Sequence, residues 1–179
     1  LKDLTPDDFK KYFEGDPFQR MNINQDPFIT LNNALVNEGL LLKLNRKNTS
    51  KPVYCYHFST GLQQHHIVNS RLMVLIEEDS KLDLSEFYYS APGDGGFENH
   101  LTEIFAERGS KMNYYKIQEK SADEVHLNHT NIYQKESSNI NTFTFALKGK
   151  LLRNNLNFIL NEENCESHLY GLYYLREND

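Results

Sequence analysis

The chain has 179 residues, of which 39% are hydrophobic and 25% are charged, a composition that is sufficient to bury a core. Its 19 Lys and Arg against 25 Asp and Glu give a net charge of -6 without a basic cluster, which argues against nucleic acid as a partner. No apolar run approaches the roughly 18 residues of a membrane span, so we expect one soluble domain without membrane contact.

The N-terminal residues predict a short helix. In "LTPDDFKKYFEGD", Thr5 is a candidate N-cap, Pro6 occupies the first helical position and Gly15 ends the segment. "DPFITLNNALVNEGLLLKL" then predicts a second helical segment, followed after Gly39 by a strand that runs through Leu44. Because the chain begins with Leu rather than Met, we expect it to be part of a longer protein.

A unit of strand, polar turn and strand recurs along the rest of the chain. If Asp79, Gly109, Ser137 and Asn164 are equivalent turn positions, the period is about 30 residues. Three columns around these turns are apolar with one exception. They are Val74, Ile104, Ile132 and Ile159 five residues before the turn, Leu75, Phe105, Tyr133 and Leu160 four before, and Leu82, Met112, Ile140 and the exceptional Ser167 three after. The segments are rich in β-branched and aromatic residues, which predicts strands.

Two architectures repeat such a unit. In a β-sandwich, neighbouring hairpins run antiparallel and no position has to be apolar in every repeat. In a parallel β-helix, equivalent residues stack about 4.8 Å apart and apolar columns become a continuous core. The columns favour the parallel β-helix, an all-β fold, and place both Ile104 and Phe105 in its core. We expect a helical lead-in over residues 1–27, a β-helical core over residues 28–179, and a surface loop at "APGDGG", residues 91–96.

Five stretches in chain order carry a resemblance to a known family. They are "PFITLNNALVNEGLLLKL", "SRLMVLIEEDSKLDLSEFYYS", "NYYKIQ", "KGKLLRNNLNFIL" and "LYGLYYL". Together they resemble the β-helical core of the SufB/SufD family of the SufBCD iron–sulfur cluster assembly complex, on its SufD side, from about Asp26 onward. The resemblance implies a right-handed parallel β-helix that serves as a non-catalytic scaffold, pairs with a SufB-like subunit and acts with a SufC-like ATPase.

The same resemblance sets expectations about the cluster. In the family, the groups that hold the nascent iron–sulfur cluster, a histidine among them, and the helical domain that meets the ATPase lie beyond the position of Asp179. We therefore expect a core truncated at its C-terminal end, no cofactor bound by this segment, and a nascent cluster held only by the full complex. The apolar strand "LYGLYYL" would be covered by further coils, by a SufB-like partner or by a second copy of the chain in a homodimer.

Three pairs of residues are candidate metal ligands. Cys55 and His57 are two apart on a predicted strand and share a face, but two ligands do not make a site, and a buried Cys behaves as a small apolar residue. His126 and His129 point to opposite faces of an extended segment, and the pair His65–His66 falls in an expected surface loop. We expect no metal site here. Two distant cysteines without a secretory leader favour a reducing cytoplasm.

Two polar residues match positions of the family's strands. Arg71 and Gln118 correspond to positions that, in the sister subunit SufB, are linked to an internal passage for sulfur. The structural alternative is that Arg71 caps the edge of a coil and Gln118 forms a side-chain ladder, because buried polar groups in solenoids satisfy one another. Arg153 and Asn154 have the same two interpretations, with Asn154 a candidate turn residue.

A carbohydrate lyase or hydrolase is the alternative function for a β-helix. Such an enzyme needs two or three carboxylates from successive coils in one cleft. The turn column supplies only Asp79, and the column of Asp83 continues with Asn113, Asn141 and His168. The sequence therefore predicts no catalytic residue, and a purely structural solenoid remains the third interpretation.

Overall fold

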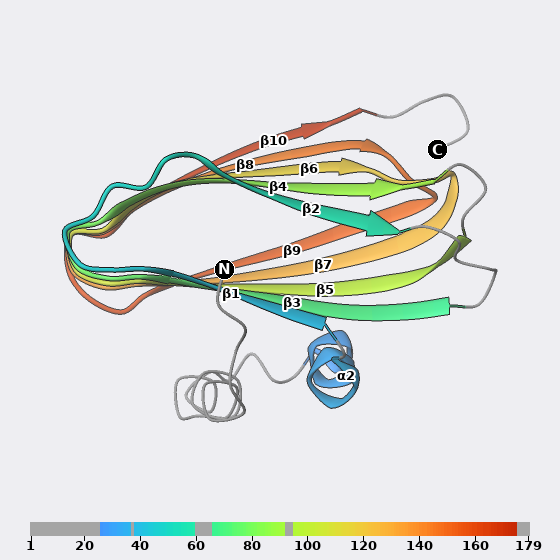
Figure 1. The fold of residues 1–179 in the computed structure, drawn as a ribbon, viewed down its shortest axis with the longest axis horizontal. Helices are drawn as coiled ribbons and strands as arrows, with labels where there is room; N and C mark the ends of the chain where they lie inside the picture. Colours follow the sequence, from blue (N-terminus) through green and yellow to red (C-terminus); the bar gives the residue numbers. More distant parts are fainter. Residues whose placement is uncertain (1–25, 37, 60–65, 92–94, 175–179) are drawn as a thin grey trace.

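The structure is a computed structural model, and it describes residues 26–36, 38–59, 66–91 and 95–174. The helix predicted to begin near Thr5 lies outside the described residues. Within them the chain forms one helix, α2 (Pro27–Leu35), and ten strands (Figure 1). The strands are β1 (Glu38–Leu44), β2 (Val53–Ser59), β3 (His66–Ile76), β4 (Lys81–Ser90), β5 (Gly95–Ala106), β6 (Lys111–Glu119), β7 (Asp123–Gln134), β8 (Asn139–Lys148), β9 (Leu151–Leu160) and β10 (Glu166–Tyr173). No helix in this part of the chain is long and apolar enough to cross a membrane.

The helix α2 is fixed against the first coils. Asp26 is its N-cap, with Oδ1 accepting a hydrogen bond from the Phe28 N–H at 2.9 Å. The buried Asn32 donates from Nδ2 to the carbonyl of Ser70 at 3.0 Å and to that of Asn99 at 2.8 Å. The helix therefore lies on the outer side of β3 and β5, and the second predicted helical segment is confirmed together with the strand that follows it.

The strands form two parallel sheets that lie face to face (Figure 1). Sheet A has the order β1-β3-β5-β7-β9, and sheet B has the order β10-β8-β6-β4-β2. Consecutive strands lie in opposite sheets, so each coil of the chain adds one strand to each sheet. All pairings between the named strands are parallel. This confirms the parallel β-helix and excludes the sandwich.

The turns between the sheets stack as the repeat predicts. Asp79, Gly109, Ser137 and Asn164 have φ values of 54°, 68°, 57° and 59°. All four lie in the left-handed region, which few residues adopt without a turn that requires it. The N–H of Asp79 donates to the carbonyl of Arg108 at 3.0 Å, so neighbouring turns are hydrogen-bonded. Lys47, with φ 56°, is the equivalent position of the first coil, which the sequence did not reveal because the next strand begins only at Val53.

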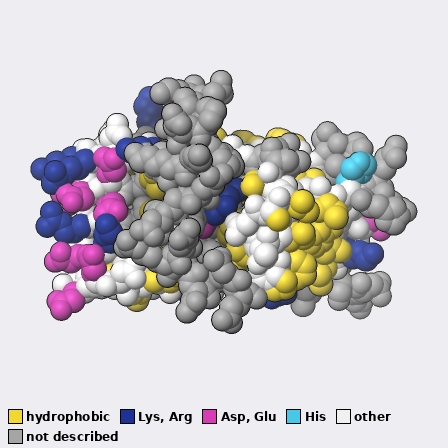
Figure 2. Space-filling model, turned by 90° about the horizontal axis from the view of Figure 1, so that it is seen from below, with side chains coloured by type: hydrophobic (Ala, Val, Ile, Leu, Met, Phe, Trp, Pro, Cys, Tyr) yellow, Lys and Arg dark blue, Asp and Glu magenta, His cyan; other side chains and the backbone are white. Residues whose placement is uncertain are grey.

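Exposed ion pairs join neighbouring coils at this turn end. They link Lys43 to Glu77 at 2.8 Å, Arg46 to Glu78 at 2.7 Å and Lys135 to Glu107 at 2.7 Å. Figure 2 shows the resulting alternation of basic and acidic side chains at one end of the molecule. Because water screens such exposed pairs, they contribute little to the free energy of unfolding.

The predicted core position of Phe105 is wrong. Phe105 is in register with Leu75 and Tyr133, as predicted, but these side chains lie on the outer face of sheet A. Adjacent residues of a strand point to opposite faces, so only the neighbouring column, that of Val74 and Ile104, reaches the core. Phe105 is half-buried and stacks on Tyr133 with ring centroids 4.9 Å apart.

The predicted columns also slip by one residue in the last coil. Tyr133 pairs with Ile159 rather than with Leu160, and Ile132 pairs with Phe158 rather than with Ile159. The turn after β9 has one more residue before its left-handed position than the earlier turns have. Counting backward from that turn therefore misplaces the strand.

The inside of the solenoid is apolar near the turns and polar at the opposite end. Next to the turns, buried apolar side chains from both sheets form one cluster. It contains Leu72, Val74, Ile76, Ile104, Ala106 and Ile132 from sheet A and Leu82, Leu84, Met112, Tyr114 and Ile140 from sheet B. The sheets spread apart with distance from the turns (Figure 1), and the inward positions there carry large polar side chains.

Two loop predictions are corrected. Gly95 and Gly96 begin β5 rather than ending a surface loop, and His66 begins β3, although its side chain is exposed as predicted. A Cβ at Gly96 would lie 3.1 Å from the carbonyl oxygen of His66. The close approach of the two strands explains why a glycine occupies a strand interior here.

The two edge strands of sheet B expose apolar side chains. On β2 these are Tyr54, Tyr56 and Phe58, and on β10 they are Leu169, Tyr170 and Leu172, each more than half exposed. Contiguous exposed apolar groups on an edge strand are typical of surfaces that another chain covers.

We expect Ile104→Ala to lower the free energy of unfolding by about 3 to 4 kcal/mol, because it leaves a cavity in the apolar cluster. Phe105→Ala, on the adjacent residue of the same strand, should cost about half as much, since the ring is only half-buried. Urea denaturation of both variants measures this difference. A larger loss for Phe105→Ala would contradict the assignment of the two faces.

Candidate functional site

The candidate site is the polar end of the interior, which we call the polar chamber. Its members are buried side chains from four strands and the residue after β6. They are Glu86 and Tyr88 from β4, Glu98 and His100 from β5, Lys116 from β6, Lys120, and Glu124, His126 and Asn128 from β7. The alternation that buries Leu82 and Leu84 continues along β4 to Glu86 and Tyr88, so the same strand lines the apolar cluster first and the chamber afterwards.

Glu86 is the centre of the first group in the chamber. Its Oε1 lies 2.8 Å from His57 Nε2 and accepts a hydrogen bond from the Tyr88 hydroxyl at 2.6 Å, while Tyr114 donates to Oε2. Burial would raise the pKa of Glu86, but the hydrogen bond and charge of His57 outweigh it and lower the pKa to about 2. The carboxylate is therefore ionised and fully satisfied.

His57 carries the matching positive charge. Burial alone would lower its pKa, but hydrogen bonds with Cys55 and Glu86 raise it to about 10. Cys55 Sγ lies 3.6 Å from His57 Nε2, so the structure brings the two predicted ligand candidates together on the inner face of β2. Since Nε2 is engaged by Glu86, the imidazole acts here as the cation of a buried ion pair.

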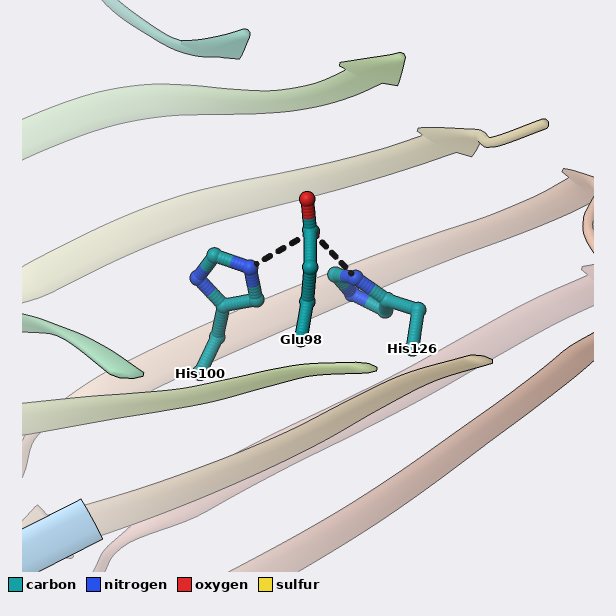
Figure 3. A group of neighbouring side chains, drawn as sticks. All are labelled: Glu98, His100 and His126. Carbon is teal, nitrogen blue, oxygen red and sulfur yellow. Dashed lines mark hydrogen bonds and ion pairs between the residues drawn. The ribbon is translucent and has the colours of Figure 1, made fainter. Parts of the chain in front are cut away.

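Glu98 is the centre of the second group (Figure 3). His100 Nε2 lies 2.9 Å from Glu98 Oε2, and His126 Nδ1 lies 3.2 Å from the same oxygen. Glu98 and His126 are register partners on β5 and β7, which places them directly opposite each other. Lys120 Nζ approaches that oxygen at 2.8 Å, and Ser59 donates to the other carboxylate oxygen.

The protonation states of this group follow from burial and charge. Burial raises the pKa of Glu98, but hydrogen bonds from His100 and His126 outweigh it and hold the pKa well below its usual range. Burial lowers the pKa of His100, and it lowers that of His126 to about 3, so both rings are neutral imidazoles. Burial and the neighbouring Glu98 raise the pKa of Glu124 to about 7. Of the carboxyl groups around Lys120, Glu98 is thus the one that is firmly ionised.

Glu98, His100 and His126 form the one group of potential metal ligands found among the described residues. Their three ligand atoms lie within 4.8 Å of one another, and all three side chains are buried. Two imidazoles with one carboxylate suit first-row transition metals, above all non-haem ferrous iron.

Lysines complete the chamber. Lys116 Nζ donates to Thr130 Oγ1 at 2.6 Å and to Asn128 Oδ1, and burial lowers the pKa of Lys116 to about 8. Asn128 Nδ2 in turn donates to the Tyr88 hydroxyl at 2.9 Å. Lys116 is therefore connected to the Glu86 group through neutral side chains. These bonds join side chains of β4, β6 and β7 in one hydrogen-bonded network between the sheets.

Lys120 also lines a pocket at the chamber's edge. The pocket has a volume of about 220 Å³ and is lined by Tyr89, Ser90, Glu119, Lys120, Ser121 and Lys148. Lys120 Nζ pairs with Glu124 at 3.0 Å in addition to Glu98. Lys120 therefore contacts both the pocket and the carboxylates of the chamber.

The structure places the two family-matched residues on opposite faces. Arg71 lies on the outer face of sheet A, where Nε donates to Glu103 Oε2 at 2.8 Å and Nη1 donates to Asn33 of α2 at 3.0 Å. Gln118 lies inside, and its amide exchanges hydrogen bonds of 2.7 and 3.2 Å with Asn154. Asn154 is consequently in the middle of β9, and its prediction as a turn residue is wrong.

The histidine pair is split as its spacing predicts. His126 faces the chamber, whereas His129, on the same strand, faces outward, where its ring contacts Asn155 and lies 4.0 Å from Asp26. Sequence reasoning missed Glu98 and His100 altogether. A signal existed: the repeat of about 30 residues that aligns the apolar columns also aligns Glu98 with His126, and Glu98 and His100 share a strand face.

Residues 57–179 match the model of the SufBD core domain of the SUF system for FeS cluster assembly. The chain belongs to this family. The match includes Glu98, His100 and His126 and covers SufB and SufD alike, so it establishes involvement in iron–sulfur cluster assembly for either kind of subunit. No curated protein matches the chain, and no solved structure does.

Replacement of His57 by Gln should destabilise the fold in a pH-dependent way. Because the folded-state pKa of His57 is raised from 6.5 to about 10, the ion pair with Glu86 stabilises fully below pH 6.5 and is lost as the pH rises toward 10. The difference in unfolding free energy between the parent and His57→Gln should therefore be largest near pH 6 and shrink toward pH 10. Urea denaturation across this range measures it.

The control for this series is His168→Gln, on β10, because the His168 side chain is exposed. This variant should differ from the parent by less than about 0.5 kcal/mol at every pH. A difference for His57→Gln that grows above pH 7 would contradict a charged His57.

Proposed function

We propose that the chain is the core of a SufD-like scaffold subunit, which pairs with a SufB-like protein and acts with a SufC-like ATPase in the cytoplasm. The observation that carries this proposal is the match to the SufBD core domain over residues 57–179, on a chain that folds as a parallel β-helix. The SufD assignment rests on the resemblance of stretches such as "RNNLNFIL" in β9. The iron–sulfur cluster is the cargo of the assembled complex in this proposal.

A scaffold role agrees better with the chamber than catalysis of carbohydrate cleavage does. A glycoside hydrolase needs two carboxyl groups that face the substrate in an open cleft. Glu86 and Glu98 are completely buried and are held by basic partners, His57 and Lys120. The column of Asp83 forms a polar ladder instead, in which Asn113 donates to Asp83 at 2.7 Å.

The exposed edge of sheet B supports association with another chain. Strand β10 pairs only with β8 among the described strands, and its apolar side chains are exposed. Further coils of the full chain and then a SufB-like subunit are the proposed occupants, and a second copy of the chain is the alternative.

Co-purification tests the proposal. The tagged chain, co-expressed with the SufB-like protein of its own source, should recover it in stoichiometric amounts. Leu172→Asp on β10 should weaken recovery of the SufB-like partner at least about 10-fold, because a buried unpaired charge is costly. The matched control is Tyr54→Asp on β2, a similarly exposed apolar position at the other edge of the same sheet. This variant should recover the SufB-like partner as the parent does.

Recovery of the chain without partners, or equal losses for both variants, would overturn this assignment. The isolated chain, incubated with ferrous iron and sulfide, should retain no stoichiometric acid-labile sulfide and should not cleave polysaccharides. Bound labile sulfide at one cluster per chain would show that the segment itself is a cluster carrier rather than a scaffold core.

A further inference from the structure

We propose that Glu98, His100 and His126 form a binding site for a single ferrous ion inside the solenoid, loaded in exchange for the Lys120 ammonium. Three features of the polar chamber carry this proposal: the geometry of the ligand atoms, the orientation of the two rings, and a cation already placed at the ligand oxygen. It departs from the expectation, drawn from the sequence, that the chain holds no metal ligands. Only the choice of iron among first-row metals rests on the proposed function.

The distances between the ligand atoms suit a metal centre. With metal–ligand bonds of about 2.1 Å, adjacent ligands of an octahedral or tetrahedral ion lie about 3.0 to 3.4 Å apart. Glu98 Oε2 is 2.9 Å from His100 Nε2 and 3.2 Å from His126 Nδ1. Two of the three ligand–ligand edges are therefore already within a few tenths of an ångström of the required length, and Figure 3 shows both rings directed at the carboxylate.

Both imidazoles direct one ring nitrogen at Glu98 Oε2, and His100 also has the second partner that is typical of metal-binding histidines. The Nδ1 atom of His100 is held by the Ser70 hydroxyl, which directs Nε2 into the chamber, and such a second partner is typical of metal-binding histidines. His126 is completely buried, and its Nε2 has no hydrogen-bond partner among the described residues. Among the described residues, Glu98 is thus the only hydrogen-bond partner of the His126 ring. Coordination of a metal ion by this ring would break no other hydrogen bond.

Three groups converge on a single carboxylate oxygen of the chamber. Lys120 Nζ lies 2.8 Å from Glu98 Oε2, and both rings approach the same atom. Hydrogen bonds from the rings help to satisfy the buried carboxylate, whose countercharge is the Lys120 ammonium. A divalent ion at the position where the three ligand atoms converge would use all of them at once.

The ammonium of Lys120 and a ferrous ion would compete for the same oxygen, because two cations about 3 Å apart repel strongly in a buried site. The pocket of about 220 Å³ gives the displaced side chain a place to go, and Glu119 in its wall offers a new carboxylate. The same pocket provides the entry path to the chamber. Lys120 therefore blocks the path from solvent to the three ligands until a ferrous ion displaces its ammonium.

Anaerobic calorimetric titration of the purified 179-residue chain with ferrous iron, in the absence of sulfide, tests the site. We expect one ion per chain. Glu98→Gln and His126→Phe should each weaken binding at least about 10-fold, whereas Lys120→Met should strengthen it about 10-fold by removing the competing charge. His129→Phe is the matched control, since His129 lies on the same strand but faces outward, and it should bind as the parent does.

The X-ray absorption spectrum of iron on the parent chain keeps the test decisive if a variant does not fold. It should show imidazole and oxygen ligands and no sulfur, which also separates this site from the Cys55–His57 pair. Absence of binding by the parent, a sulfur ligand, unchanged affinity of a folded His126→Phe variant, or weaker binding by Lys120→Met would overturn the proposal. If the chain binds iron but recovers no SufB-like partner, the iron site is supported and the proposed function is refuted.

Discussion

The stacking of equivalent side chains in successive coils is the constraint on which the rest of this structure depends. Each inward residue lies about 4.8 Å from its counterparts above and below and is shielded from water. A charge in such a column must be matched by its neighbours, because an unpaired buried charge costs several kcal/mol. Glu86 accordingly stacks against Lys116 in the next coil. Glu98 stacks against the neutral His126, and its charge is matched by Lys120.

The widening of the solenoid explains why polar groups gather at one end. Near the turns the two sheets are close, and branched aliphatic side chains such as Val74 and Ile104 fill the space at the density typical of protein interiors. Farther from the turns the sheets diverge (Figure 1), and longer side chains such as Lys116 and Tyr88 reach across. Polar groups are tolerated there because they form hydrogen bonds with one another. They give the interior carboxylate, imidazole and ammonium groups, which an aliphatic core lacks.

The two proposals, a scaffold role and an iron site, are compatible in this fold. In a β-helix the outer surface is available to partners while the interior side chains are held by the two sheets. An iron site within such a core would hold the ion away from solvent until Lys120 returns to Glu98, so that loading and release are coupled to the movement of one side chain. The family to which the chain belongs needs iron for its product, and a site of this kind would supply it without making the chain a cluster carrier.

The sequence by itself determined the coil. The recurrence of Asp79, Gly109 and Ser137 fixed the turns, and Met112 and Ile140 fixed the register of sheet B, because a left-handed turn and a buried apolar column each restrict the residue types locally. Only the tertiary structure decided which side chains face the interior and which of them meet there. Column counting could not tell Ile104 from Phe105, since both columns are apolar and the two faces of sheet A are both partly covered. Nor could it assemble the polar chamber: Glu98 and His126 are 28 residues apart, and Glu86 faces them from the other sheet, so their meeting depends on how two strand faces oppose each other in space.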